Sequence, residues 1–293
     1  MISRVTAPAM TQTAMRHLQA NLTELARLQQ QATSQRAFSA PSDDPAAAAT
    51  ALDLHAEQRR NEQYARNVDD GVAWVTTADS AIAASTALLG RARDLTVRGA
   101  NDGAMDATAK EAIAVELEGI RDELLAKANT RLLGRSVFAG TSNTAAFAAD
   151  YSFSGAPGAE VMRRISDSAS VRVDTDGAEV FGTGGDSVFA LIDTIVADLR
   201  SGTNVGPRLG EIDDRLTAML SAQGAVGTRQ SQIERAKEAA VQNSVSLEAR
   251  RAAVEDVDSV EVLVRLQAQE LVYRSSLAVN ARVLQPSLMD FLQ

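Results

Sequence analysis

The chain of 293 residues contains no cysteine, only six prolines and few aromatic residues, which make up 4% of the total. Without cysteine it forms no disulfide, no thiol nucleophile and no thiolate metal site. The scarcity of aromatics, with Trp74 as the single tryptophan, favours close helix contacts over a thick globular core. No segment approaches the ~18 unbroken apolar residues of a membrane helix, and the N-terminus lacks the apolar region of a signal peptide. We therefore expect neither a membrane partner nor a cleaved leader.

The basic residues do not form a cluster in the sequence. The sequence has 38 acidic and 29 basic residues, which gives a net charge of -9, and the basic residues are scattered among the acids. A protein that tracks the phosphates of a nucleic acid needs clustered positive charge. The composition therefore excludes nucleic acid as an expected partner.

Apolar residues recur at steps of three and four through the first 133 residues, which is typical of helices. The three stripes are Met15, Leu18, Leu22 and Leu25; Val68, Val72, Val75, Ala78 and Ile82; and Ile113, Leu117, Ile120 and Leu124. Breaks are expected at "SAPSDDPAAAAT" and at "RGANDGAMD". In the first of these, Asp44 suits the N-cap position and Pro45 the first helical position, so a helix is predicted to begin at Pro45.

The texture changes between about residues 134 and 185. The segments "YSFSG", "EVMRRI", "SVRVD" and "AEVFG" are short, rich in valine and aromatics, and separated by turn-forming residues. We interpret them as a small antiparallel β-rich domain inserted between helical regions. In this interpretation "VDTDG" is a hairpin turn rather than a calcium loop, because Arg172 and Thr183 would occupy its first and twelfth ligand positions. A short helix is expected from Val188 to Leu199.

The third region carries the strongest periodicity of the chain. Seven apolar residues follow one another at intervals of seven: Ile212, Met219, Val226, Ile233, Ala240, Leu247 and Val254. This spacing predicts a heptad seam. The companion seam positions after Leu216 are polar, so only half of the seam is apolar, and the helix is expected to pack within its own subunit against the first region.

The last helix has two adjacent apolar stripes. One comprises Val257, Val260, Val264, Leu271 and Ala278, and the other Leu263, Leu266, Tyr273, Leu277 and Leu284. Together they exceed the ~100° face that one partner helix covers. Such a helix needs neighbours on two sides, which indicates burial between several copies of the chain or its relatives.

These patterns predict a mainly α-helical fold, a long antiparallel helical bundle or coiled-coil rod with an inserted β-rich domain. The expected divisions are an N-terminal polymerisation helix (1–44), the first half of the rod (45–133), the β-rich outer domain (134–205), the second half of the rod (206–256) and a C-terminal polymerisation helix (257–293). The two terminal helices are expected to be mobile in a lone subunit.

Catalytic and metal-binding chemistry finds little support. His17 and His55 fall on different helices, and no second histidine lies at four-residue spacing from either. The aspartate doublets, such as Asp43 with Asp44, are better explained as helix starts or solvated faces. We therefore predict no enzyme activity, no cofactor and no metal.

Several motifs together resemble a known family. "PSDDP" after an N-terminal leucine helix, "VFAG" at residues 137–140, "VRVDTDGAEVFG" in the central region and "QPSLMDFL" at the end are similar to the hook–filament junction proteins of the flagellin superfamily. The resemblance implies a structural adapter that joins the flagellar hook to the filament. Its implied partners are the first hook-associated protein, flagellin, other copies of itself in a ring, and an export chaperone. The implied location is extracellular, after export through the flagellar apparatus without a cleaved signal peptide.

The residues expected to carry assembly lie at the two ends of the chain and in the "PSDDP" motif. They are Leu18, Leu22, Leu25, Asp43, Asp44, Val260, Leu263, Val264, Leu266, Leu271, Tyr273, Leu277, Leu284, Leu288 and Phe291. Two alternatives stay open at this point. One is a short flagellin that forms the filament itself, and the other is an intracellular coiled-coil scaffold without a flagellar role.

Overall fold

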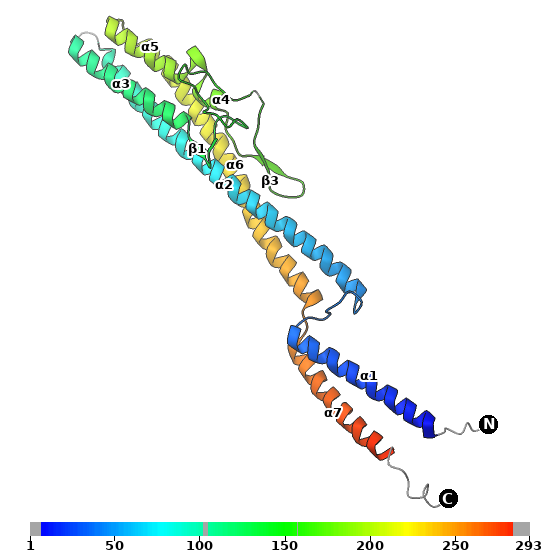
Figure 1. Ribbon diagram of the computed structural model, residues 1–293. Helices are drawn as coiled ribbons and strands as arrows, with labels where there is room; N and C mark the ends of the chain where they lie inside the picture. The colour runs from blue at the N-terminus through cyan, green and yellow to red at the C-terminus, as the bar shows by residue number, and fades with distance from the viewer. Residues whose placement is uncertain (1–6, 102–104, 157, 284–293) are drawn as a thin grey trace, which may run out of the picture. The chain divides into compact units, whose positions relative to one another are not determined.

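The computed structural model describes residues 7–101, 105–156 and 158–283 (Figure 1). Long helices dominate this part of the chain, and the few strands are two or three residues long, which confirms the predicted fold class. The elements are α1 (Ala7–Ser34), α2 (Pro45–Gly99), α3 (Ala107–Ala128), β1 (Arg131–Leu132), β2 (Arg135–Ser136), β3 (Met162–Arg164), β4 (Ser170–Arg172), α4 (Gly177–Phe181), the 3-10 helix η1 (Gly184–Asp186), α5 (Val188–Ser201), α6 (Arg208–Glu255) and α7 (Ser259–Val283).

The chain divides into two compact units. The terminal unit comprises Met1–Arg59 and Ser244–Gln293, and the central unit comprises Arg60–Asn243. Helices α2 and α6 supply residues to both units.

In the central unit, α2 and α6 lie side by side and antiparallel. Arg93 pairs with Asp213 at 2.6 Å, whereas Lys237 pairs with Asp69 at 3.0 Å, so the numbers rise on one helix as they fall on the other. The heptad seam predicted for α6 is confirmed in this unit, because its residues from Ile212 to Ala240 are all buried. The last two predicted members belong to the terminal unit, where Leu247 is buried and Val254 is half-buried. On α2, the stripe from Val68 to Ile82 faces the same core. The repeat of seven residues thus produces an intramolecular helix pair, as the half-polar companion positions predict.

Helices α3 and α5 extend this pair at one end of the central unit. The predicted stripe of α3 is confirmed, since Ile113, Leu117, Ile120 and Leu124 are buried. The helix predicted to begin at Val188 is also confirmed; Ser187 accepts a hydrogen bond from the Ala190 amide at its start. Ion pairs from Arg200 to Glu111 and Glu118 join α5 to α3 at the surface.

The insertion between α3 and α5 contains less β-structure than the sequence predicts. Two antiparallel hairpins are present, β1 with β2 and β3 with β4. The expectation of a strand at "AEVFG" is wrong, because this segment forms α4, and "VDTDG" is not a hairpin turn. Asp176 caps α4 by accepting a hydrogen bond from the Ala178 amide at 2.9 Å, which starts a helix where alternation predicts a strand.

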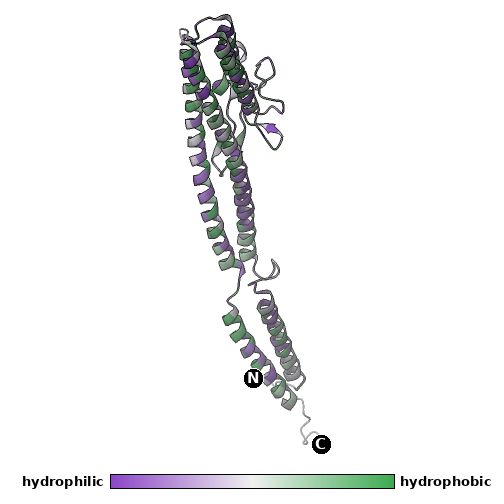
Figure 2. Cartoon of the chain, turned by 90° about the vertical axis from the view of Figure 1, so that its left-hand side faces the viewer, coloured by the Kyte–Doolittle hydropathy of each residue, from purple (hydrophilic) through white to green (hydrophobic). Residues whose placement is uncertain are grey.

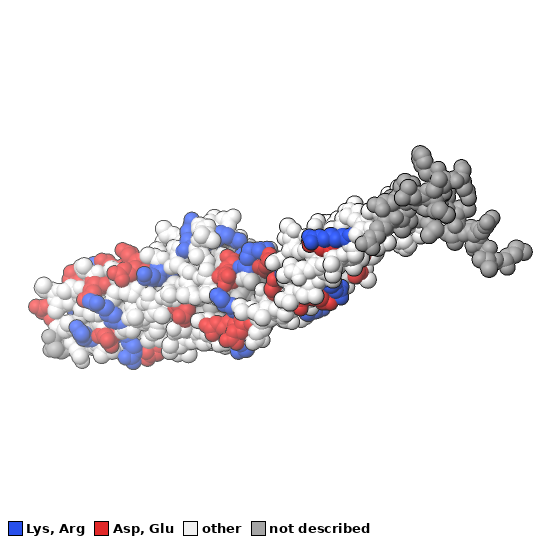
Figure 3. All heavy atoms as spheres, turned by 90° about the horizontal axis from the view of Figure 1, so that it is seen from below, with Lys and Arg blue, Asp and Glu red and all other residues white. Residues whose placement is uncertain are grey.

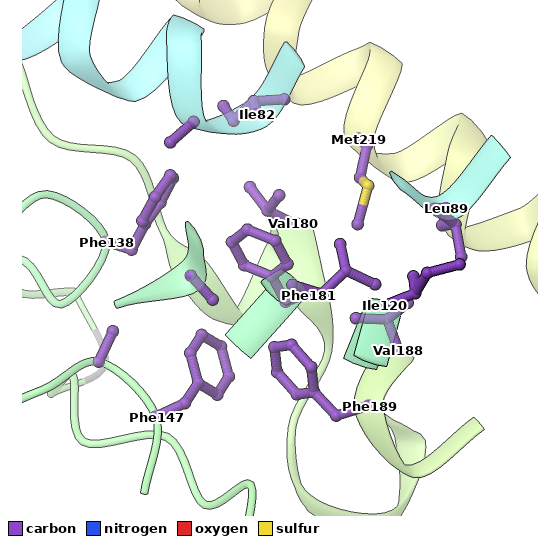
Figure 4. Close-up of a cluster of buried hydrophobic side chains, with 14 of the residues drawn as sticks. Ile82, Leu89, Ile120, Phe138, Phe147, Val180, Phe181, Val188, Phe189 and Met219 are labelled. Atoms are coloured by element: carbon purple, nitrogen blue, oxygen red, sulfur yellow. The ribbon is translucent and has the colours of Figure 1, made fainter. Parts of the chain in front are cut away.

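Aromatic side chains concentrate where the insertion meets the helices. Phe138, Phe147, Phe181 and Phe189 are buried and point toward one another (Figure 4). Their ring centroids lie 5.3 to 5.9 Å apart, from Phe138 to Phe181, from Phe147 to Phe181 and Phe189, and from Phe181 to Phe189. Three of these pairs are edge-to-face and the pair of Phe181 with Phe189 is stacked, and such ring contacts add to the free energy of burial. The insertion therefore shares one core with the surrounding helices.

By length and composition alone, α2 has a stretch apolar enough to cross a membrane. The same test is passed by core helices of water-exposed proteins, and the apolar stripe of α2 from Val68 to Leu89 is buried against its own chain. This stretch therefore gives no argument for a membrane span.

The turn between β1 and β2 provides a stability test in the central unit. Leu133 and Gly134 form this two-residue turn, both with positive φ (49° and 83°), and the Leu133 side chain is 89% exposed. Such a turn favours Asn-Gly, whereas a left-handed leucine costs about 1 kcal/mol or more. We expect Leu133→Asn to raise the free energy of unfolding by about 1 kcal/mol, measured by chemical denaturation. Leu133→Ala removes the same exposed side chain but keeps the backbone cost; an equal gain in both variants would contradict the explanation.

Candidate assembly surface

Helices α1 and α7 of the terminal unit lie side by side (Figure 2). The burial of their side chains shows that they pack along one stripe of each helix. We call this contact the seam. Its members, the buried and half-buried residues at alternating steps of three and four, are Thr11, Ala14, Leu18, Asn21, Leu25 and Leu28 on α1, and Val262, Leu266, Gln269, Tyr273, Ser276 and Asn280 on α7. Leu28 and Val262 are the most buried, at 3% and 4% exposed. Half of the α7 residues in the seam are polar, so the pairing buries little apolar surface.

Seven other large apolar residues of α7 are exposed. We call them the outer face of α7: Val260, Leu263, Val264, Leu271, Val272, Leu277 and Val279. Val260 and Leu271 are 73% and 69% exposed, although both are large aliphatic side chains. Several large exposed aliphatic side chains on one helix are typical of an interaction surface. The terminal unit alone thus covers one face of α7 and leaves the other without a partner.

The structure divides the predicted assembly residues between the seam and the exposed surface. Leu18, Leu25, Leu266 and Tyr273 lie in the seam, and Val260, Leu263, Val264, Leu271 and Leu277 lie on the outer face of α7. Leu22 is 49% exposed on α1, as is its neighbour Met15 at 58%. Leu284, Leu288 and Phe291 fall outside the described residues.

The single stripe expected from Met15 to Leu25 is therefore wrong. The seam of α1 runs through Ala14 and Asn21, one position before each exposed residue, because α1 turns its mixed polar stripe toward α7. Sequence reasoning also missed Leu28 and Val262, the two most buried seam residues. The seven-residue step from Asn21 to Leu28 was the available signal, but a search for apolar residues alone passes over Asn21.

Asp43 and Asp44 both have partners in the segment that connects α1 to α2. The Asp43 carboxylate accepts hydrogen bonds from the amides of Ala40 (2.9 Å) and Ser39 (3.0 Å), which lower its pKa. Asp44 accepts from the amides of Ala46 and Ala47 and thereby caps α2, so the predicted start at Pro45 is confirmed. The two carboxylates thus shape one turn and one helix start.

The two segments that connect the helix pairs are hydrogen-bonded to each other. The Ala37 amide donates to the Glu255 carbonyl at 2.7 Å, and the Val257 amide donates to the Gln35 carbonyl at 3.2 Å. Gln35 adopts a left-handed backbone conformation (φ 55°), which is uncommon for a residue with a side chain. We call this two-bond contact the joint; it ties the end of α1 to the end of α6.

The side chain of Glu255 stabilises the joint by accepting hydrogen bonds from α2 and α6. Its side chain is buried and accepts hydrogen bonds from His55 Nε2 at 2.6 Å and from Arg251 at 3.0 Å. Burial by itself raises the pKa of Glu255, but the hydrogen bonds from Arg251 and His55 outweigh burial and hold the pKa below its usual value. His55, considered above as a polar helix position, thus binds the last residue of α6 to α2.

The described residues give little support for a catalytic or metal-binding site. No group of three or more histidine, aspartate or glutamate side chains is arranged to hold a metal ion among residues 7–101, 105–156 and 158–283. A cavity of about 30 Å³ beside Phe138, Gly140 and Asp174 has room for about one water molecule. On the face shown in Figure 3, basic and acidic side chains alternate without a large field of one sign. The outer face of α7 is therefore the strongest candidate for function.

Comparisons with known proteins match both ends of the chain. Residues 5–143 match the bacterial flagellin N-terminal helical region, and residues 209–292 match the bacterial flagellin C-terminal helical region. Flagellar hook-associated protein 3 of Salmonella typhimurium is 27% identical over 238 residues, which cover 72% of this chain and 74% of that protein. Flagellin of Bacillus subtilis is 25% identical over 255 residues, covering 82% and 83%.

A solved structure shows the same fold. The crystal structure of FlgL from Bacillus cereus superimposes with a TM-score of 0.60 at 21% sequence identity, and the match covers 68% of this chain and 99% of that one. Because the sequence identity is 21%, this similarity supports a shared fold and nothing further.

The charge state of Glu255 makes a prediction for the terminal unit. Because its pKa is lowered on folding, its stabilising contribution is present at neutral pH and is lost as the pH falls through the depressed value, below 4.5. We expect Glu255→Gln to lower the free energy of unfolding by about 2 kcal/mol at pH 7, and by much less at pH 3, in denaturation curves at both pH values.

Glu248→Gln is the matched control. Glu248 also binds Arg251 but is exposed, so its replacement is expected to change the stability little at either pH. A loss for Glu255→Gln that stays equal at pH 3 and pH 7 would show that its charge does not stabilise the joint.

Proposed function

Because this chain belongs to the flagellin family of bacterial flagellar proteins, we propose that it is a structural, non-enzymatic adapter that joins the flagellar hook to the filament. The observation that carries the proposal is the outer face of α7, seven exposed apolar side chains on a helix whose opposite side is already paired. The likeness to hook-associated protein 3 over 72% of the chain and the motifs at both ends support the same role.

The mechanism is mechanical. Copies of the chain bury the outer face of α7 against neighbouring terminal units and so form a ring. Leu22 and Met15 on α1 add apolar surface to the same unit, and Leu284, Leu288 and Phe291 belong to the proposed interface as well. Burial of these side chains supplies the free energy of assembly, at about 25 cal/mol per Å² of apolar surface. Residues 1–44 and 257–293 are the proposed polymerisation segments.

The partners follow from a position between hook and filament. The ring binds the first hook-associated protein on one side and flagellin on the other. Before assembly, the chain is exported through the flagellar apparatus, without a cleaved signal peptide, to the outside of the cell. An export chaperone covers the apolar C-terminal helix until then, because an exposed surface of this kind promotes aggregation.

A short flagellin is the second candidate, favoured by the coverage of Bacillus subtilis flagellin, which exceeds that of hook-associated protein 3. Purified chain added to isolated hooks separates the two. A junction protein forms one short band at the distal end of the hook and stops, whereas a flagellin elongates into a filament, as seen by electron microscopy with antibody labelling. Growth of long filaments would overturn the adapter proposal.

The outer face of α7 makes a direct prediction. We expect Val264→Glu with Leu271→Glu to reduce binding to hooks by about tenfold or more, because burying a carboxylate in an apolar contact is costly. The monomer's stability should change little, since both side chains are exposed. Thr228→Glu with Gln232→Glu adds the same charge to exposed positions of α6 in the central unit as a control. Normal binding by the α7 variant in a hook-pelleting assay would refute the role of this face.

Asp43 and Asp44 are proposed to support assembly by setting the turn before α2 and by meeting arginine side chains of a neighbouring copy. Replacement of both by alanine is expected to weaken hook binding more than it lowers the thermal midpoint of the monomer. Their hydrogen bonds to Ser39, Ala40, Ala46 and Ala47 account for a part of the folding effect. Parallel losses in the two measurements would leave these carboxylates with a local role only.

A further inference from the structure

The hairpin of β1 and β2 in the central unit has a strained and exposed tip. Leu133 combines a left-handed backbone (φ 49°) with a side chain that is 89% exposed. A Cβ atom added at the neighbouring Gly134 would meet no atom within 4 Å, so the tip projects into open space. Strained residues are concentrated at functional sites, where another contact offsets their cost. The fold of the hairpin itself does not require a leucine at this position.

Two arginines flank this tip without a carboxylate partner in the described part of the chain. The guanidinium of Arg135 lies over the Trp74 ring, 5.8 Å from its centroid, and its Nε atom is buried without a hydrogen-bond partner there. Arg131, on the other strand, is exposed and has no ion pair among the same residues. A ring face compensates a guanidinium less fully than a carboxylate does. The hairpin therefore presents an apolar tip between two positive charges, which complements an acidic surface.

Helix α3 of the same unit has such a surface. Five carboxylates and one arginine occur between residues 111 and 123. Val115 is 54% exposed, and one turn later a Cβ atom added at Gly119 would meet no atom within 4 Å. One turn further, Glu123 is exposed and has no ion pair among the described residues. Because residues four apart lie on one helix face, the open space at Gly119 lies between an apolar side chain and an unpaired carboxylate.

We propose that the β1–β2 hairpin of one copy docks on α3 of a second copy. Leu133 fills the open space at Gly119 and packs against Val115, and Arg131 then pairs with Glu123. The hairpin cannot make this contact within its own chain, where Leu133 is 89% exposed.

A second copy is the occupant that the charges favour, because the chain has a net charge of -9 and presents its acidic helix α3 in every copy. Hairpin and α3 are different surfaces, so the contact is heterologous and can repeat from copy to copy around a ring. Its place in a ring rests on the proposed function, whereas the contact between two copies does not.

The absence of cysteine allows this contact to be trapped in the full chain. One chain carries Arg131→Cys and the other Glu123→Cys, so that a disulfide replaces the proposed ion pair while Leu133 and Gly119 stay unchanged. We expect the mixed chains to form a cross-linked heterodimer several-fold faster than a pair in which Arg235→Cys replaces Arg131→Cys, as measured by mass spectrometry. Arg235 on α6 is the matched control, since it is also an exposed arginine without an ion pair among the described residues.

Leu133→Asn separates docking from folding. Added to the Arg131→Cys chain, it is expected to slow the cross-linking several-fold, although the same change relieves the strain of the turn. Equal cross-linking rates for the Arg131 and Arg235 pairs would overturn the inference, as would a rate that Leu133→Asn leaves unchanged.

The hook assay distinguishes this contact from the proposed function. Specific cross-linking by a chain that does not bind hooks would count against the adapter role and support the contact. Normal hook binding by a chain that does not cross-link through this pair would overturn the contact and leave the adapter proposal intact.

Discussion

One partner helix can cover only one face of another, and this limit governs the terminal unit. Helix α7 has apolar residues on more than one face, yet the unit supplies a single partner, α1. The distribution of polar residues on α7 is the reverse of what an isolated pair requires. Gln269, Ser276 and Asn280 lie in the seam, while aliphatic side chains such as Val264 and Leu271 are exposed. Seven large aliphatic side chains of α7 are therefore exposed in the terminal unit.

In the central unit, by contrast, the paired helices α2 and α6 bury their apolar residues against each other and against the rest of that unit. Every seventh residue of α6 from Ile212 to Ala240 is buried, and polar partners such as Arg93 with Asp213 lie beside the contact rather than within it. The chain's few aromatic residues are concentrated there, with four of its seven phenylalanines in one cluster. The central unit thus buries its apolar surface within the subunit, whereas the terminal unit leaves the outer face of α7 exposed.

The joint connects the helix pairs through hydrogen bonds between their linking segments. Helices α6 and α7 are interrupted at residues 256–258, and α1 and α2 are separated by residues 35–44. Both interruptions expose backbone amides and carbonyls, and these groups pair with each other or with Asp43 and Asp44. A left-handed Gln35 and a buried carboxylate at Glu255 are local costs that the surrounding hydrogen bonds offset. The joint thereby supports the pairing of the terminal helices, whose seam contains the buried Leu28 and Val262.

The sequence by itself determined the helical class, the start of α2 at Pro45, the seam of α6 and the excess apolar surface of α7, because each depends on residues that are neighbours along one helix. Only the tertiary structure decided which stripe of α7 faces α1. That choice depends on which of two surfaces of α7 packs better against α1, a helix more than 200 residues away in the sequence. In addition, a search for apolar periodicity does not detect polar seam members such as Asn21. The same holds for "AEVFG", whose short alternating pattern fits a strand or a helix equally well until the Asp176 cap and the contacts of Phe181 select the helix. Local spacing encodes elements, whereas the pairing of their faces depends on free-energy differences between contacts that the chain brings together only when it folds.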